Sequence, residues 1–417
     1  MATRGIWLWR RRKVTFPPME KVVMAYSGGL DTTAALHWLK RTKGFKVIAV
    51  CLNLGQGADM VDVAQRAIES GADAVHVPDV RRQFVKQFCF KALRAQAVYE
   101  GGYMLSAALS RPLIATELVR HAHEEGARYV AHGAPPKGND QFRFECSVAA
   151  MDPALSTIAP LREWEYQTRE QILEFAKSRK LPIPQVAHAG YSTDRNLWGA
   201  RSGGGVLDDP AVAPPEEVFQ ITVSPHKAPD EPGLVEVEFE QGEPVGLDGA
   251  RLPCEELVAR LEKLAGRHGV GRVDTMENRI LGFKSREVYE QPAATVLYKA
   301  HDALEQLTLD NELYNYKALL SQRYAKCVYD SQWFSTLRES LDSFFKESQR
   351  FVTGKVKVEL FKGAARVVSR ASEFSIYDRE KANIQHPDGI PSQDIEGYLG
   401  LRKLSQLTRA FRQKPKV

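Results

Sequence analysis

Short apolar runs alternate with amphipathic segments between residues 21 and 132, and this alternation restricts the fold more than any other feature of the chain. The apolar runs are "KVVMAY", "KVIAVCLN", "AVHVPD" and "RYVAH", and helical periodicity covers residues 31–40, 58–70, 80–98 and 113–125. Strands that alternate with helices over short connections are parallel. The sequence therefore predicts an α/β fold with a doubly wound, Rossmann-like parallel sheet, which binds ligands at the carboxyl ends of its strands.

The pattern changes beyond residue 185. Gly- and Pro-rich strings up to residue 233 predict long loops, whereas "LVEVEFEQGEPVGLDG" and "KVKVELFKGAARVVSR" alternate and turn at glycine, as hairpins do. Helical patterns cover residues 255–264, the leucine-rich stretch around 304–320, and a basic amphipathic segment over 395–412. We therefore expect a parallel-sheet domain over 19–185, an α+β domain over 186–385 and a partner-docking helical tail over 386–417.

Composition argues against several classes of protein. The net charge of +5, from 57 basic and 52 acidic residues, is small for 417 residues, and the basic cluster at residues 10–13 is more typical of a solvated segment than of a nucleic-acid-binding arm. Five cysteines without a C-x-x-C pair predict the reduced thiols of a cytoplasmic protein. No window of the sequence approaches the roughly 18 apolar residues of a membrane span. We expect neither a nucleic acid nor a membrane as partner.

The first apolar run leads directly into "SGGLDTT", residues 27–33. Gly28 and Gly29 allow backbone N–H groups to approach an anion, Ser27 adds a hydroxyl, and the following helix points its unpaired N–H groups to the same place. Asp31 fits there as a helix N-cap, as a ligand of phosphate-bound Mg²⁺, or as both. A purely structural turn is the alternative. The pattern favours a phosphate loop that is neither of the G-x-x-x-x-G-K-[ST] nor of the G-x-G-x-x-G type.

The loop resembles that of the PP-loop ATP pyrophosphatases, which cleave ATP between the α and β phosphates. The strings "YEGGYMLSAALSRPLIA", "AHGAPPKGNDQFRFE", "RHGVGRVDTMENRILGFKSREVYEQPAATVLYKAH" and "LTLD" follow it in order, and together they resemble the argininosuccinate synthase family. The resemblance covers both expected domains. It implies an ATP- and Mg²⁺-dependent ligase that joins citrulline to aspartate through citrullyl-AMP, releases AMP and pyrophosphate, and forms a cytoplasmic homotetramer.

The resemblance also implies which residues bind each substrate, and it assigns no covalent nucleophile. ATP would be held by Ala25, Tyr26, Ser27, Gly28, Gly29, Leu30, Asp31, Thr32, Thr33, Leu52 and Gly133, with Asp31 also close to the metal. Citrulline would be held by Tyr103, Asn139, Arg143, Ser192, Glu277 and Tyr289, and aspartate by Asn139 and Asp140. Arg111 and Lys137 are further candidates for phosphate or carboxylate contacts, and His132 is as well explained by a structural role as by that of a base. Each of these residues, taken alone, is more often structural.

Several positions depart from the family's pattern, and they fall in the two amino-acid pockets. The family has serine at positions 108 and 201, threonine at 135 and glutamate at 203, where this chain has Ala108, Arg201, Pro135 and Gly203. Larger or different side chains also occur at Glu287, Gln291, Ala293 and Ala294. Each buried hydrogen-bond partner that is lost costs about 1–3 kcal/mol. Two alternatives therefore stay open: a divergent ligase that adenylates another amide, urea or carboxylate, and a nucleotide-binding descendant without catalysis.

Overall fold

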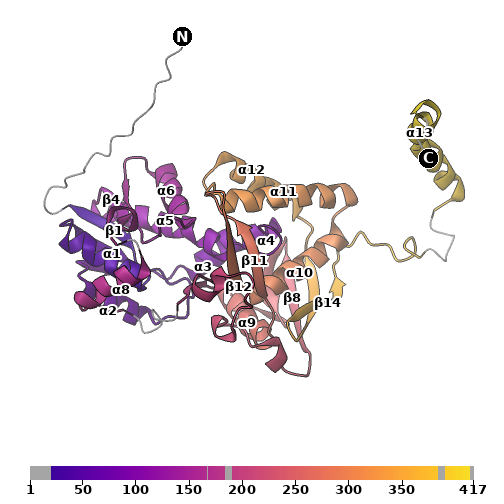
Figure 1. Cartoon of the computed structure of the whole chain (residues 1–417). Coiled ribbons are helices and arrows are strands. Elements are labelled where there is room, and N and C mark those ends of the chain that lie inside the picture. Colours follow the sequence, from indigo (N-terminus) through magenta and orange to yellow (C-terminus); the bar gives the residue numbers. More distant parts are fainter. Residues whose placement is uncertain (1–19, 167, 184–189, 384–389, 414–417) are drawn as a thin grey trace, which may run out of the picture.

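The computed structural model describes residues 20–166, 168–183, 190–383 and 390–413. Figure 1 shows an N-terminal domain built around β1 and α1, a C-terminal domain that contains β11, β12 and α10, and a separate helix near the C-terminus. The domain boundaries that we expect at 185/186 and 385/386 lie outside the described residues and stay predictions.

The N-terminal domain contains the predicted doubly wound parallel sheet. Its strands lie in the order β3-β2-β1-β4-β5, and every neighbouring pair is parallel. The strands are β1 (Lys21–Ala25), β2 (Lys46–Val50), β3 (Ala74–His76), β4 (Tyr129–Ala131) and β5 (Ser156–Ile158). The direction of winding reverses between β1 and β4, so their carboxyl ends form the switch point at which such sheets bind ligands.

Helices cover both faces of this sheet. Val22 and Met24 of β1 pack in one apolar cluster, whereas Val23 between them packs in another, as the alternation of side chains along a strand requires. The first cluster includes residues of α1 (Leu30–Arg41), α2 (Met60–Ser70), α7 (Pro160–Glu163) and α8 (Arg169–Ser178). The second includes residues of α5 (Ser106–Glu125) and α6 (Asp140–Met151). The α/β prediction is confirmed.

The C-terminal domain contains two antiparallel sheets together with helices. One has the order β10-β9-β8-β13-β14 and contains both predicted hairpins. Its strands are β8 (Gly233–Glu240), β9 (Glu243–Leu247), β10 (Ala250–Arg251), β13 (Gly354–Phe361) and β14 (Ala364–Ala371). Its apolar residues share a core with α9 (Cys254–Arg267) and α10 (Pro292–Thr308), and α11 (Asn311–Tyr329) and α12 (Thr336–Ser348) complete the domain.

The other sheet has the order β11-β12-β7-β6 and lies where the two domains meet. Its strands are β6 (Ser192–Asn196), β7 (Gly199–Gly203), β11 (Arg272–Asn278) and β12 (Lys284–Glu290). The first two fall in the segment that we predict as loops, so that prediction is wrong there. These strands, "STDRN" and "GARSG", lack the apolar alternation of a core strand because one face of the sheet carries polar residues. The short 3₁₀ helices η3 (Gly205–Asp208), η4 (Glu216–Val218) and η5 (Pro225–Lys227) follow.

Some helices differ from the predicted ranges. The pattern over 80–98 is divided into α3 (Arg81–Phe84), the π-helix η1 (Val85–Cys89) and α4 (Phe90–Arg94), and it ends early because Gln96 has φ of +47°. Helix α5 begins seven residues before the predicted start and contains Pro112. The pattern around 304–320 is two helices, α10 and α11, separated where Asp310 caps the second by accepting from Leu313 N–H at 2.9 Å.

The C-terminal helix α13 (Ser392–Gln413) confirms the predicted amphipathic segment and stands apart from both domains (Figure 1). None of its residues is buried. Its apolar side chains are open to solvent, with Tyr398 64%, Leu401 71% and Phe411 80% exposed. Within the described ranges, no helix has both the length and the apolarity that a membrane crossing requires.

Candidate active site

The loop between β1 and α1 forms a backbone cradle at the switch point of the parallel sheet. Gly28 has φ of +76°, and a Cβ at this position would lie 2.9 Å from Nη2 of Arg66. The Ser27 hydroxyl accepts a hydrogen bond from Gly29 N–H at 3.4 Å and lies 3.0 Å from the Thr32 hydroxyl. Helix α1 starts at Leu30, so its first unpaired N–H groups face the same space. The arrangement fits an anion of the phosphate type.

Three side chains within residues 25–33 are buried in the protein interior and stabilise this loop. Tyr26 and Leu30 are each 4% exposed, Thr33 is fully buried, and the Tyr26 hydroxyl lies 2.9 Å from Thr33 Oγ1. Among the side chains of this segment, Ser27 is exposed and Asp31 and Thr32 are partly exposed. A ligand in the cradle would therefore meet these three side chains and the backbone of the two glycines.

Asp31 does not cap helix α1, so the capping interpretation is wrong. The N-cap residue is Gly29, which makes no side-chain hydrogen bond, and Asp31 is the second residue of the helix. Burial raises the pKa of the Asp31 carboxyl, and Arg169 of α8 opposes that shift. A carboxylate in this position is left for a ligand or a cation beside the cradle. Within the described ranges, no three His, Cys, Asp or Glu side chains gather as a metal site, so phosphate oxygens would have to complete any Mg²⁺ shell.

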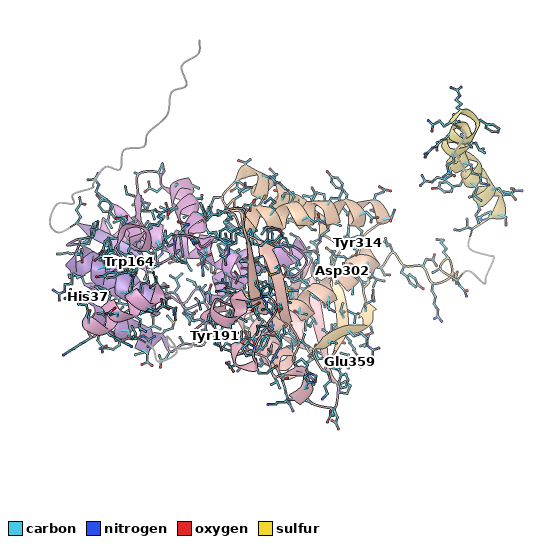
Figure 2. The ribbon with its side chains drawn as sticks, in the orientation of Figure 1. His37, Trp164, Tyr191, Asp302, Tyr314 and Glu359 are labelled. Atoms are coloured by element: carbon cyan, nitrogen blue, oxygen red, sulfur yellow. The ribbon has the colours of Figure 1, made fainter. Side chains whose placement is uncertain are left out.

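A cavity of about 170 Å³ opens beside Asp31. It is lined by Asp31, Pro135, Pro136, Leu161, Trp164, Tyr166, Arg169 and Ile172. Figure 2 shows Trp164, one of its aromatic walls, among the helices of the N-terminal domain. Pro135, which departs from the family's pattern, and its neighbour Pro136 thus line a recess next to the cradle.

Arg66 of α2 is a basic residue at the cradle that sequence reasoning missed. Its guanidinium group is the nearest neighbour of the position that a Cβ on Gly28 would occupy. Its Nε is buried and has no hydrogen-bond partner among the described residues. The amphipathic pattern of α2 gives no sign that one arginine reaches back over the loop. A cation with an unused donor beside an anion cradle fits a phosphate contact.

Leu52 and Gly133 lie at the same edge of the sheet as the cradle. Each follows its strand by two residues, β2 for Leu52 and β4 for Gly133. A Cβ on Gly133 would lie 2.7 Å from Cγ2 of Thr32, so the two chain segments approach closely only because residue 133 is glycine. The structure therefore brings both residues beside the loop, as the resemblance implies.

His132 is a buried histidine with partners on both ring nitrogens. Ala134 N–H donates to its Nδ1 at 3.2 Å, its Nε2 lies 3.4 Å from Glu145 Oε1, and its ring stacks on Phe144. Because Nδ1 accepts, the proton belongs on Nε2, where it faces Glu145. This arrangement is structural, and we assign no chemistry to His132.

The second group of predicted residues gathers on one face of the β11-β12-β7-β6 sheet. Glu277 of β11 is 4% exposed and accepts hydrogen bonds from the hydroxyls of Tyr289 at 2.7 Å and Tyr329 at 2.8 Å. Tyr289 stacks on Tyr103 with ring centroids 4.3 Å apart. Burial raises the pKa of Glu277, as does the charge of Glu287, against the hydrogen bond from Tyr289. This face presents one carboxylate framed by aromatic hydroxyls.

Asn139 joins this face to the N-terminal domain. Its side-chain amide donates to the Tyr329 hydroxyl at 2.8 Å, and its Oδ1 accepts from Ile280 N–H at 3.1 Å. Arg143, one turn along α6, donates from Nε to the Tyr329 carbonyl at 3.1 Å. Arg143 Nη2 is buried without a partner among the described residues, so a donor remains for a ligand.

Asp140 is held between two arginines. Arg143 Nη1 donates to its Oδ1 at 2.8 Å and Arg111 Nη2 to its Oδ2 at 2.9 Å. Burial alone would raise the pKa of Asp140, but the two guanidinium groups outweigh burial and hold that pKa well below its usual range. Arg111 also pairs with Asp194 of β6, and its Nε is buried without a partner among the described residues. The N-terminal domain is thus tied to the site sheet by charge.

The remaining predicted residues are more open. Ser192 is exposed at the start of β6, opposite Gly203 in the strand register, and Lys137 is exposed in the loop before α6. Ala108, where the family has a hydroxyl, is 1% exposed, and its N–H donates to the Tyr103 hydroxyl at 3.0 Å. The structure therefore brings the aromatic, amide and carboxylate candidates together and leaves Lys137 at the rim.

Comparison with known proteins matches nearly the whole described chain. Residues 21–182 match the model of the arginosuccinate synthase N-terminal HUP domain, and residues 191–408 match that of the arginosuccinate synthase C-terminal domain. The chain belongs to the argininosuccinate synthase family. The argininosuccinate synthase of Carboxydothermus hydrogenoformans is 46% identical over 396 residues, which cover 95% of this chain and 99% of that protein. That of Bacillus subtilis is 46% identical over 382 residues, covering 92% and 94%.

Three of the departures from the argininosuccinate synthase pattern, Arg201, Gly203 and Glu287, lie together. The Arg201 side chain lies on the site face, where it is the register partner of Tyr289, and its Nε donates to Glu287 Oε2 at 2.5 Å. Arg279 and the Ser285 hydroxyl also bind the Glu287 carboxylate. The new arginine is therefore inside the site and paired with a new acid.

Tyr329 and Asp194 are two further members of this candidate site that the sequence did not single out. Tyr329 is fully buried at the end of α11 and links Glu277 to Asn139. Asp194 lies on β6, where we expect a loop. Both contacts join segments far apart in the chain, so no local pattern in one sequence reveals them.

Proposed function

We propose that this chain is an ATP-dependent ligase that condenses citrulline with aspartate to give argininosuccinate, AMP and pyrophosphate. Family membership over both domains supports an AMP-forming ligase of this kind. The proposal depends on one observation: two sites of different chemistry lie beside the same helix. A phosphate cradle at the end of β1 and the polar face of the β11-β12-β7-β6 sheet share helix α5, whose Arg111 lies between Asp140 and Asp194.

ATP is the substrate that we assign to the cradle. The backbone of residues 25–33 and the end of helix α1 would hold its phosphates, with Arg66 as an additional donor, and Leu52 and Gly133 would lie beside the adenosine. Mg²⁺, when bound, would neutralise charge on the leaving pyrophosphate, and Asp31 is the residue placed to hold it. The bare backbone at Gly28 and the unused Nε of Arg66 support this assignment.

Citrulline and aspartate are the substrates that we assign to the sheet face. Glu277 suits an ammonium group and the free Nη2 of Arg143 suits a carboxylate. Tyr103, Asn139, Ser192 and Tyr289 would complete the citrulline pocket, and Asn139 and Asp140 would face aspartate. Asp140 stays ionised because Arg111 and Arg143 flank it, so it keeps the charge that an ammonium group needs.

The reaction needs no covalent bond to the enzyme. The ureido oxygen of citrulline attacks the α phosphate and pyrophosphate leaves; the amine of aspartate then displaces AMP from the activated carbon. The chain supplies orientation, donors for the phosphate oxygens and an anchored amino-acid end. Such positioning accounts for barrier reductions on the order of 7–11 kcal/mol in well-aligned reactions.

We further propose a cytoplasmic homotetramer in which α13 clasps a neighbouring copy. A helix with no buried residue and with Tyr398, Leu401 and Phe411 open to solvent supports a partner surface. Gel filtration of a chain ending at Ser392 tests this assignment. Fewer subunits per particle than in the full chain would support the clasp, and the same number of subunits would contradict it.

Isotope exchange between pyrophosphate and ATP tests the ligase. We expect exchange that depends on citrulline and Mg²⁺, followed by argininosuccinate when aspartate is added. Exchange with another urea, amide or carboxylate but not with citrulline would establish the divergent ligase instead. ATP binding without exchange for any compound would establish a non-catalytic descendant.

A further inference from the structure

A cluster of three charged residues, Arg201, Arg279 and Glu287, occupies the site face of β7 and β12. Arg201 Nε donates to Glu287 Oε2 at 2.5 Å, and Arg279 pairs with the other oxygen of the same carboxylate. Glu287 is 1% exposed, whereas the Arg201 side chain is 26% exposed. One buried carboxylate thus serves two guanidinium groups, and the cluster carries one net positive charge.

Gly203 makes room for this cluster. A Cβ at position 203 would lie 2.8 Å from Arg201 Nη2 and 2.8 Å from Glu287 Oε2. Both are closer than real Cβ contacts, so a side chain at 203 would force the tips of Arg201 and Glu287 to shift. The acid that the family's pattern places at 203 is therefore supplied here by Glu287 from the neighbouring strand. Unlike a lone glutamate, it is neutralised by arginine.

The outer edge of Arg201 is left without a partner. Only Nε makes a hydrogen bond within the described ranges, and neither Nη1 nor Nη2 is among the buried atoms that lack partners. These two nitrogens therefore face open space on the site side of the sheet. A guanidinium edge with two free N–H groups matches a carboxylate bidentately, which no serine does.

The position of this edge selects the amino-acid end of the citrulline site. Arg201 is the register partner of Tyr289, whose hydroxyl donates to Glu277 and whose ring stacks on Tyr103. Arg143, another cation near this face, has Nε on the Tyr329 carbonyl and Nη1 on Asp140, which leaves Nη2. Arg279 is bound to Ser285 and Glu287, and Arg111 to Asp140 and Asp194. Arg201 is therefore the cation that can bind a carboxylate with two N–H groups.

We propose that Arg201, held in place by Glu287, is a specificity-determining residue that binds the carboxylate of the ureido amino acid. The inference rests on the proposed function, because it names the group that the same pocket recognises. It makes Arg201, Gly203 and Glu287 one unit: the arginine binds, the glutamate orients it and the glycine leaves space for both.

The test compares citrulline with citrullinamide, in which the carboxylate is replaced by a carboxamide. Calorimetry measures the affinity of both compounds for the full-length protein and for Arg201→Met, which leaves Glu287 paired with Arg279. We expect the unchanged protein to prefer citrulline, and Arg201→Met to reduce that preference about 10- to 100-fold by weakening citrulline alone. Lys284→Met, at an exposed position on the neighbouring strand β12, is the charge-loss control and should leave the preference unchanged.

Gly203→Ala provides a second variant that keeps every charge. Its Cβ would shift the tips of Arg201 and Glu287, so it should also lower the preference for citrulline, by less than Arg201→Met does, while ATP affinity stays as it is. An unaltered preference in Arg201→Met with normal ATP binding would overturn the proposal, and so would the absence of citrulline binding to the unchanged protein. Carboxylate-dependent binding without pyrophosphate exchange would instead reject the ligase function and leave this inference standing.

Discussion

The phosphate cradle and the sheet-face pocket are built in opposite ways. The cradle is one continuous stretch, residues 25–33. Its backbone N–H groups face the space for an anion, and its buried side chains only stabilise the turn. The pocket collects side chains from α5, α6, β6, β7, β11, β12 and α11, and its charged groups depend on each other, as Asp140 does on Arg111 and Arg143. A backbone site tolerates little change, whereas a side-chain site can exchange one set of charges for another.

That difference accounts for where this chain departs from its family. The loop keeps its glycines because Gly28 adopts a positive φ under Arg66. In the pocket, a glutamate disappears at position 203 and another appears at 287 with an arginine to pair it. Three variants and one pH dependence test this contrast.

The largest effect is expected at Gly28. Gly28→Ala places a Cβ 2.9 Å from Arg66 at a φ of +76°, and both the collision and the backbone strain fall on the groups that hold phosphate. We expect kcat/KM for ATP to fall by at least about 100-fold, equivalent to about 2.7 kcal/mol. Steady-state kinetics measures this loss. Gly126→Ala is the control, because Gly126 also has a positive φ, of +62°, but open space around it; a similar loss there would mean that strain alone is responsible.

A smaller and more selective effect is expected at Glu277. Glu277→Gln removes the charge that faces an ammonium group while keeping an oxygen for one tyrosine hydroxyl. We expect KM for citrulline to rise roughly 10- to 100-fold, with KM for ATP nearly unchanged. Glu359→Gln, on β13 of the other antiparallel sheet, should change neither value. Equal effects on both substrates would show that the two regions are not separable.

Arg66→Met should affect the cradle and not the sheet-face pocket. Removing a donor beside the cradle should raise KM for ATP about tenfold and leave citrulline affinity as it is. Arg128→Met, just before β4 at the opposite edge of the sheet, is the matched control. An unchanged KM for ATP would mean that Arg66 has only a structural role.

The smallest effect is a pH dependence of stability. Burial raises the pKa of Glu277 above its ordinary value near 4.5, so the folded protein binds this proton more tightly than the unfolded chain does. The stability that this proton contributes is complete below pH 4.5 and is lost as pH rises through the raised pKa. The free energy of unfolding should therefore fall with a slope of up to about 1.4 kcal/mol per pH unit in that window.

Urea unfolding of the ligand-free protein at several pH values checks this slope, with Glu277→Gln as the reference. The difference between the two proteins isolates Glu277 from other carboxyl groups such as Asp140, whose lowered pKa acts in the opposite direction. A difference that does not vary with pH would mean that the tyrosine hydrogen bonds offset burial.

Local sequence was sufficient for the N-terminal domain and insufficient for the site sheet. The strands of the parallel sheet are buried on both faces and are apolar, so "KVVMA" and "KVIAV" stand out. Strands β6 and β7 carry Ser192, Asp194, Arg201 and Gly203, because their inner face lines a polar pocket, and they look like loops. Of the two roles predicted for Asp31, the helix cap is wrong, because helix α1 begins at Leu30 and Gly29 is its N-cap residue.

The parallel-sheet domain and the glycine-rich turn after its first strand could be predicted from the sequence alone, because strand periodicity and a short turn are encoded by neighbouring residues, and the order of motifs indicated the family. Only the tertiary structure decided that Arg66 covers the loop, that Tyr329 links Glu277 to Asn139 and that Arg201 pairs with Glu287 inside the site. These contacts join residues 38 to 190 positions apart or belong to neighbouring strands, and their charges and hydrogen bonds take effect only at distances of a few ångströms that folding creates.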